Sequence, residues 1–437
     1  MEWYVVLCSI VLLLIVLITI GVAIPFALAA ASLPFLWGIQ SWNTSLVSTQ
    51  IKTWGVWVDY VLLSVPLFVL LGELVGRSQI GPRLYRAMHY GVPVRGAAAY
   101  GSVAACAGFG AVCGSSMVGA LTIGTVALPE MLKLGYGRQL SSGIVAAGGT
   151  LSVLIPPSLI LLYYGIVTDV SIGDLFIAGV VPGLILTGLF AALIRVWRIV
   201  RPGDVPPEDS TQPIGMAEML LAFAPVLLIA SIIIVSIYFG IATPTESAAV
   251  AVVVTTLLAF GIGGLTLHDF LEALTATLRT MGFLGILVSA AILFGFVLNY
   301  YQIPQQLSEA IAALKLSPAM LMGLAILFYL IIGMFLEPTS ITFITLPTLF
   351  PIIAGAGYDL VWFGIIFTVT MEIAVLTPPV GLNLYILHRL VPAGQLNVGD
   401  VIVGSMPFVV MMLTLIGLLL IFPELALWLP KAARRAA

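Results

Sequence analysis

The sequence predicts an all-α polytopic membrane protein built from two inverted repeats, and three observations predict it. Of the 437 residues, 61% are hydrophobic and only 8% are charged, whereas soluble domains carry about 25% charged residues. Apolar runs long enough for a spanning helix, which needs roughly 20 residues, recur along the whole chain. The third observation is a set of proline, glycine and tyrosine positions that recurs in the second half.

The composition excludes several classes of function. A net charge of −3 predicts no nucleic-acid partner. The three cysteines lie in apolar runs without metal-ligand spacing, and the three histidines are scattered. The chain contains no zinc-protease helix, nucleophile elbow or phosphate loop. A lipid bilayer is the expected surrounding, and the first apolar run is expected to be a span rather than a cleaved signal peptide.

The first repeat is predicted to cover residues 1–200, and a polar linker to follow at 201–216. Its spans are expected at apolar runs near 4–20, 22–38, 55–76, 139–165 and 175–197. A polar stretch, 40–53, separates the second run from the third. A longer apolar segment, 96–131, is divided at its middle by Gly114-Ser115-Ser116.

Basic loops predict how the spans are oriented, because loops rich in Lys and Arg mark the cytoplasmic side. Segment 96–131 has one such loop before it, from Arg77 to Arg95, and another after it, at Lys133 and Arg138. A full span would place one of these loops outside. The segment is therefore predicted to be a re-entrant hairpin with its tip inside the membrane. The same count places both termini outside, although the C-terminal tail is basic.

The second repeat is predicted to cover residues 217–437. Its spans are expected near 217–239, 243–263, 280–301, 360–388 and 401–422, and its hairpin at about 318–351. Pro129, Gly135-Tyr136, Pro156-Pro157 and Tyr163 match Pro351, Gly357-Tyr358, Pro378-Pro379 and Tyr385 at a common offset of 222 residues. With five spans and one hairpin in each half, the odd number of spans inverts the second copy, as in many secondary transporters.

Each repeat has two predicted helix breaks inside the membrane. The hairpin tips are Gly114-Ser115-Ser116 and Glu337-Pro338-Thr339-Ser340, and the other breaks are the double prolines Pro156-Pro157 and Pro378-Pro379. A double proline removes two amide donors, so the helix must unwind there. The freed carbonyls can form a cage for a hard monovalent cation, together with the hydroxyls of Ser115, Ser116, Thr339, Ser340 and Thr377. Half-helix N-termini carry partial positive charge that suits a carboxylate.

These breaks indicate a cation-coupled carrier of a small anion. Any single small or hydroxyl residue among them is equally compatible with close helix packing alone.

Five glutamates also lie in or at the ends of apolar runs: Glu73, Glu130, Glu246, Glu337 and Glu372. Glu73 and Glu130 are interpreted as interfacial partners of Arg77 or Lys133. Glu337 and Glu372 are the stronger candidates for the translocation site. Asn383 is a candidate polar ligand or cap, and Tyr163 and Tyr385 are expected to pack.

The segments around these breaks resemble the large membrane subunit of TRAP (tripartite ATP-independent periplasmic) transporters, the DctM-type permease. In the first half the resemblance rests on Gly114-Ser115-Ser116, Leu128-Pro129-Glu130-Met131, Gly135-Tyr136, Gly148-Gly149-Thr150-Leu151 and Ile155-Pro156-Pro157-Ser158. In the second half it rests on Phe363-Gly364-Ile365-Ile366, Glu372-Ile373 and Leu376-Thr377-Pro378-Pro379-Val380-Gly381-Leu382-Asn383-Leu384. It covers nearly the whole chain, and it implies a transport domain that moves as an elevator against a scaffold.

The resemblance also implies partners and ligands. It implies an extracytoplasmic binding protein that captures an organic acid, a small four-helix membrane subunit, and sodium as the coupling ion, with no other cofactor, in the bacterial inner membrane. By position, the sodium ligands would be Gly114, Ser115, Ser116, Gly149, Thr150, Pro156, Thr339, Ser340, Thr377, Pro378 and Gly381. The solute ligands would be Ser115, Ser116, Glu337, Thr339, Ser340 and Asn383. The chain departs from the family at Glu337-Pro338, where many members have Asp-Gly, and at Thr370-Met371.

Two other classes of protein remain open at this point. One is a self-sufficient sodium–anion symporter with the same inverted hairpins, although the chain lacks the four extra spans of the small subunit. The other is an intramembrane enzyme, which needs a nucleophile with a base, or paired aspartates, at membrane depth. Asp59, Asp169 and Asp174 lie at span ends, so an enzyme is not expected.

Overall fold

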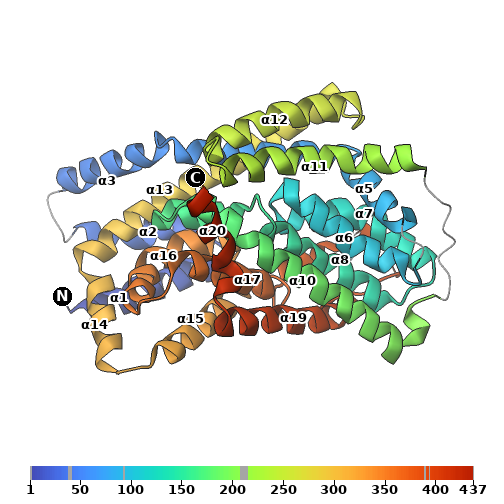
Figure 1. Cartoon of the computed structure of the whole chain (residues 1–437). Coiled ribbons are helices and arrows are strands. Elements are labelled where there is room, and N and C mark those ends of the chain that lie inside the picture. Colours follow the sequence, from blue (N-terminus) through green and yellow to red (C-terminus); the bar gives the residue numbers. More distant parts are fainter. Residues whose placement is uncertain are drawn as a thin grey trace.

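The computed structural model describes residues 2–37, 42–91, 94–206, 215–387, 390–392 and 394–436, and this part of the chain is helical without strands (Figure 1). The first half contains α1 (Trp3–Thr19), α2 (Ile24–Trp37), α3 (Trp42–Trp57), η1 (Val61–Leu63), α4 (Ser64–Arg77), α5 (Ile80–Gly91), α6 (Ala97–Cys113), α7 (Ser116–Lys133), α8 (Arg138–Leu154), α9 (Leu159–Thr168), α10 (Ile172–Val200) and η2 (Pro202–Asp204). The second half contains α11 (Met216–Tyr238), α12 (Pro244–Gly261), α13 (Leu267–Tyr300), α14 (Ile303–Ala313), α15 (Pro318–Gly333), α16 (Pro338–Gly355), α17 (Leu360–Ala374), α18 (Leu382–Leu387), α19 (Val398–Ile421) and α20 (Glu424–Ala436).

Many of these helices suit a membrane. Within the described part, seven are long and apolar enough to cross one, counting Arg138–Thr168 as a single broken span. The bent pair Val61–Arg77 and Ile80–Gly91, which turns by 60°, adds an eighth if it is one span. Shorter apolar helices include α1, α6, α15 and α17. The predicted all-α, multi-pass architecture is confirmed.

The first predicted hairpin segment forms two helices, α6 and α7, whose outer ends lie together. Before α6, the Arg95 guanidinium donates hydrogen bonds to the carbonyls of Val205 at 3.4 Å and Pro206 at 3.3 Å. After α7, the Gly137 N–H donates to the Asp204 carbonyl at 2.9 Å. The start of α6 and the end of α7 therefore both contact residues 204–206, which follow α10. The break between α6 and α7 lies at the other end of these two helices.

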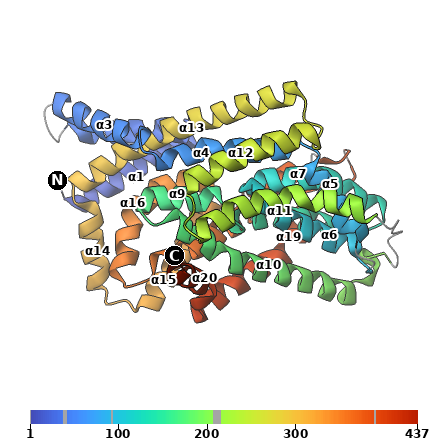
Figure 2. The ribbon, with the colours of Figure 1, turned by 45° about the horizontal axis from the view of Figure 1, so that its top comes forward.

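The second pair, α15 and α16, has its base at the other end of α10 (Figures 1 and 2). Ala319 near the start of α15 and Gly357 after α16 line one small cavity together with Pro423, just before α20. Helix α20 in turn reaches the N-terminal end of α10, where the Arg434 guanidinium binds the Asp174 carboxylate at 2.5 Å. The outer ends of the two helical pairs, away from their breaks, thus lie at opposite ends of α10.

The recurring glycines have similar backbones in the two halves. Gly135 has φ +90° and its match Gly357 has φ +81°. Gly21 and Gly240, each four residues before a proline, have φ +90° and +64°. Glycine adopts this left-handed region without the steric penalty of a side chain. The Pro156-Pro157 and Pro378-Pro379 bonds are both cis.

The structure adds helices that apolar runs alone did not predict. Helix α3 occupies most of the polar stretch 40–53, and α13 begins at Leu267 rather than near 280. A capping box formed by Thr266 and Asp269 fixes that earlier start. The basic C-terminal tail forms the amphipathic helix α20. Of the predicted linker 201–216, residues 201–206 pack against the protein, whereas 207–214 lie outside the described residues.

Helix α8 is the centre of the bundle, because every residue from Leu140 to Leu154 is buried. It packs against α6, α7 and α19. A Cβ atom built on Gly143 would collide with the Gly404 carbonyl of α19, and one built on Gly404 would collide with the Gln139 carbonyl of α8. The two backbones are therefore in direct contact, which only small residues permit in a membrane bundle.

Two basic residues of the tail, Lys431 and Arg434, have acidic partners, and this pairing predicts only a small stability effect. Arg434→Ala removes the ion pair with Asp174, in which the Arg434 side chain is 65% exposed and the Asp174 side chain 14% exposed. Exposed ion pairs contribute about 0–1 kcal/mol, so we expect the melting temperature of the purified protein to fall by no more than a few degrees. Arg435→Ala, at an exposed neighbouring position, is the matched control. Unfolding of the Arg434→Ala protein at room temperature would contradict this prediction.

Candidate functional site

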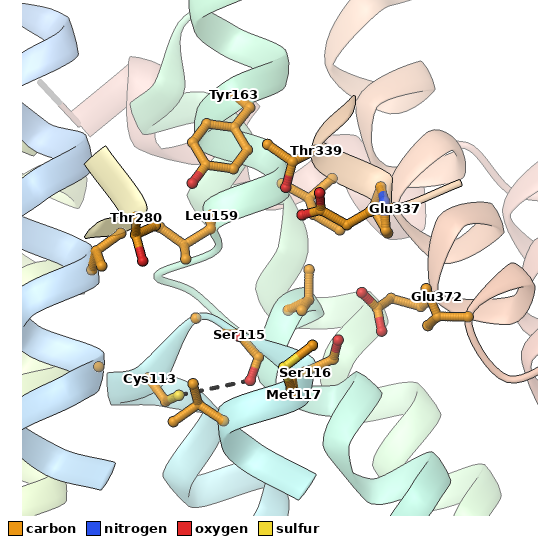
Figure 3. Close-up of a pocket in the computed structure, with 18 of the residues that line it drawn as sticks. Cys113, Ser115, Ser116, Met117, Leu159, Tyr163, Thr280, Glu337, Thr339 and Glu372 are labelled. Atoms are coloured by element: carbon orange, nitrogen blue, oxygen red, sulfur yellow. Dashed lines mark hydrogen bonds between the residues drawn. The ribbon is translucent and has the colours of Figure 1, made fainter. Parts of the chain in front are cut away.

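A cavity of about 300 Å³ lies where the two helical pairs meet (Figure 3). Its lining includes residues from both predicted tips and from the helices behind them: Gly114, Ser115, Ser116, Glu337, Pro338, Thr339, Glu372 and Asn383. Ser115 and Ser116 lie on one side of the cavity, and Glu337 and Thr339 lie across from them. The structure therefore joins the two breaks, which are more than two hundred residues apart in the sequence.

The first tip contacts the first double proline. Helix α6 ends at Cys113 because Gly114 has φ +68°, a left-handed conformation that ends helices. The Gly114 carbonyl accepts a hydrogen bond from the Leu159 N–H at 3.1 Å. The Ser158 hydroxyl accepts from the Leu161 N–H at 3.3 Å and so caps α9 after the break. The predicted unwinding at Pro156-Pro157 is confirmed, and it occurs beside the tip.

The second tip contacts the second double proline in a similar way. The Met334 carbonyl at the end of α15 accepts a hydrogen bond from the Val380 N–H at 3.3 Å. Helix α17 ends at Ala374, and α18 starts at Leu382 after Gly381, which has φ +55°. Each half therefore brings one hairpin tip and one unwound segment into direct contact.

Two helices begin at the cavity. Helix α7 starts at Ser116 and α16 starts at Pro338, and both residues line the cavity. The first N–H groups of a helix have no partner within it, and they carry partial positive charge that favours an anion. Neither Ser115 nor Glu337 caps its helix with its side chain. The backbone at both starts can therefore serve an anionic group of a ligand.

The interfacial glutamates have identifiable partners. Glu73 accepts a hydrogen bond from Arg77 at 3.2 Å, which confirms the predicted pair, and Arg77 also binds Glu272. Glu130 accepts a hydrogen bond from the Tyr90 hydroxyl at 3.0 Å, a contact that the sequence did not predict. Glu246 forms a capping box with Thr243 at the start of α12. Glu73 nevertheless also lines the cavity.

Glu337 and Glu372 differ from these three glutamates. The Ser340 hydroxyl donates a hydrogen bond to Glu337 at 3.5 Å. Glu372 is only 1% exposed, and its carboxylate has no well-formed hydrogen bond in the described part of the chain, where the Ser116 hydroxyl is the donor beside it. Its carboxylate points toward Ser116 at the edge of the cavity. The Asn383 amide nitrogen, also buried, lacks a partner there as well. Buried polar groups are costly when unpaired, so these two residues mark a place for a ligand.

Several predicted ligands are not among the residues that line the cavity. They are Gly149, Thr150, Pro156, Ser340, Thr377, Pro378 and Gly381. A Cβ atom on Gly149 would lie 2.7 Å from the Ser116 carbonyl, so this glycine supports the first tip. The Thr150 and Thr377 hydroxyls donate to carbonyls earlier in the chain, those of Ala147 at 2.6 Å and Ile373 at 2.7 Å.

The cavity also contains residues that sequence reasoning missed. Gly72 of α4 and Thr280 of α13 line it, and a Cβ atom on Gly72 would lie 2.9 Å from the Cys113 carbonyl. A lone glycine or threonine in an apolar helix does not indicate from the sequence that the residue lines a cavity. Tyr163, expected only to pack, also lines the cavity and points into it. Its match Tyr385 is not among the lining residues and is 46% exposed.

Comparison with known proteins matches this chain to one family of transporter subunits. Residues 11–425 match the family model of the DctM component of tripartite ATP-independent periplasmic transporters. The chain is 32% identical over 444 residues to the C4-dicarboxylate TRAP transporter large permease protein of Rhodobacter capsulatus, covering 96% of this chain and 97% of that one. It is 33% identical over 377 residues to the ectoine TRAP transporter large permease protein of Halomonas elongata, covering 86% and 87%.

Solved structures show a related fold. The YdaH transporter of Alcanivorax borkumensis superposes with a TM-score of 0.62 at 14% identity, covering 89% of this chain and 88% of that one. MtrF of Neisseria gonorrhoeae superposes with a TM-score of 0.59 at 12% identity, covering 86% and 84%. At such low identity the likeness concerns the fold alone.

Proposed function

The chain belongs to the DctM family of tripartite ATP-independent periplasmic transporters, and we propose that it carries a small organic acid across the bacterial inner membrane in symport with sodium. As a large permease subunit it is a transporter component rather than an enzyme. The family implies a small membrane subunit and a periplasmic binding protein as partners. In our proposal the small subunit has four helices, and the binding protein delivers the solute.

The main support for this proposal is that two helices, α7 and α16, begin at the same cavity. The N-termini of α7 and α16 suit a carboxylate, and the unwound segments at the two double prolines contact the tips from which these helices begin. Each tip and its double proline would form one sodium cage, with the ligands predicted from the sequence. Carbonyl and hydroxyl oxygens are the ligands that hard cations prefer.

The arrangement of the helices supports the inverted repeat and an elevator mechanism. The two hairpins, open toward opposite ends of α10, would enter the membrane from opposite sides, and the halves 1–200 and 217–437 would be the two repeats. In this proposal, α6–α10 and α15–α19 move together against a scaffold of α1, α2, α4 and α11–α13. The cavity fits that boundary, since Gly72 and Thr280 face the two tips from α4 and α13.

Uptake into reconstituted vesicles tests the proposal. Vesicles should contain this chain with its cognate small subunit, and the cognate binding protein should be added outside with its radiolabelled ligand. We expect uptake only when all three proteins and an inward sodium gradient are present. Equal uptake with potassium in place of sodium would contradict the proposed coupling of transport to sodium. Uptake by this chain alone would instead favour a self-sufficient symporter.

A single substitution tests the first cage. Ser116→Ala removes a hydroxyl at the start of α7 while leaving the helix intact. We expect the sodium concentration for half-maximal uptake to rise several-fold, since losing one oxygen ligand costs about 1–2 kcal/mol. Ser102→Ala is the matched control, because that buried hydroxyl of α6 bonds to the Ala98 carbonyl away from the cavity. An unchanged sodium response of Ser116→Ala would show that the assignment of the first cage is wrong.

A further inference from the structure

The charge of the cavity is unusual for a site that receives an anion. Three carboxylates line it, those of Glu73, Glu337 and Glu372, while no Lys, Arg or His belongs to its lining in the described part of the chain. Arg77 balances Glu73 at 3.2 Å from outside the lining. Two carboxylates, Glu337 and Glu372, therefore remain without a basic partner beside the proposed solute.

The surroundings of these two carboxylates point to a ligand that carries positive charge. Glu372 is buried and lines the cavity, and within the described residues its carboxylate has the neutral Ser116 hydroxyl beside it but no well-formed hydrogen bond and no ion pair. The proposed sodium cages consist of carbonyls and hydroxyls at the breaks and use neither carboxylate. A solute with two carboxylates would bring further negative charge beside Glu337 and Glu372, and like charges in a buried site repel strongly.

We propose that the solute of this permease is a zwitterion, with a cationic nitrogen between Glu337 and Glu372 and a carboxylate at the starts of α7 and α16. The inference rests on the proposed carrier function and names the class of solute that the same site takes. A cavity of about 300 Å³ is at the small end of ligand sites and suits a compact molecule. Asn383, with its unpartnered amide nitrogen, can donate a further hydrogen bond to the solute carboxylate.

The first test identifies the charge of the solute. The cognate binding protein is titrated with a zwitterion, ectoine, with glycine betaine, which has a permanent cationic nitrogen, and with the dianion succinate. The bound compound is then followed into vesicles that contain the permease and its small subunit. We expect binding and sodium-driven uptake of a compound with a cationic nitrogen. Sodium-driven uptake of succinate alone would overturn the zwitterion and leave the carrier function standing. If no bound compound enters with sodium, the carrier function fails and the inference fails with it.

The second test asks whether the two carboxylates contact the cationic group. Glu337→Gln and Glu372→Gln keep the size of each side chain, and the amide oxygen of the Glu337→Gln variant can still accept the Ser340 hydrogen bond. We expect each variant to raise the KM for the cationic solute at least tenfold, with an unchanged elution profile of the purified complex. Glu309→Gln, at an exposed position of α14, is the matched control and should leave KM unchanged. An unchanged KM in both cavity variants would overturn the assignment.

Discussion

Replacing Gly114 with valine is expected to abolish transport. Gly114 has φ +68°, and a Cβ atom there would lie 2.8 Å from the Pro157 carbonyl oxygen. The left-handed conformation alone costs an ordinary residue roughly 1–2 kcal/mol, and β-branching and the backbone collision add to this cost. Either the tip separates from the double proline or α6 ends elsewhere, and both changes displace Ser115 and Ser116 from the cavity.

The measurement is sodium-driven uptake by the reconstituted complex, at matched amounts of folded protein. Gly135→Val is the control, because Gly135 has φ +90° but nothing lies within 4 Å of its Cβ position. That variant has the same conformational cost far from the cavity, so it should be less stable but still transport. If Gly114→Val transports at the normal rate, the contact between the first tip and the double proline is not needed for function.

Replacing Gly404 with leucine is expected to have the largest effect on the folded protein. The Gly404 backbone touches that of Gln139, and the Gly143 position touches Gly404, so no side chain fits between α8 and α19. Leucine must push the two helices apart. Since α8 is buried along its length and also supports the first tip, we expect the loss of monodisperse protein in gel filtration.

Gly417 provides a control on the same helix, because nothing lies within 4 Å of its Cβ position. Gly417→Leu should give a normal elution profile and normal uptake. A well-folded Gly404→Leu protein would contradict the close crossing of α8 and α19. Small residues at helix crossings in membranes allow the backbone contact that van der Waals packing requires.

Part of the candidate site could be predicted because its cause is local. Proline lacks an N–H and glycine accepts a positive φ, so the breaks near Gly114, Pro156 and Pro378 follow from the residues themselves. The recurrence of the same landmarks suggested that the breaks would be paired. Of the predicted solute ligands, all but Ser340 line the cavity.

The sequence by itself determined that the protein lies in a lipid bilayer, where the breaks at the two tips and the two double prolines fall, and which family the chain resembles. Only the tertiary structure decided which breaks meet, that Gly72 and Thr280 close the cavity from α4 and α13, and that two carboxylates face it without a basic partner in its lining, within the part of the chain that is described. Those facts depend on contacts between segments far apart in the chain. Apolar periodicity cannot encode them, because in a bilayer every face of a helix can be apolar, and helix packing rather than polarity selects the neighbours.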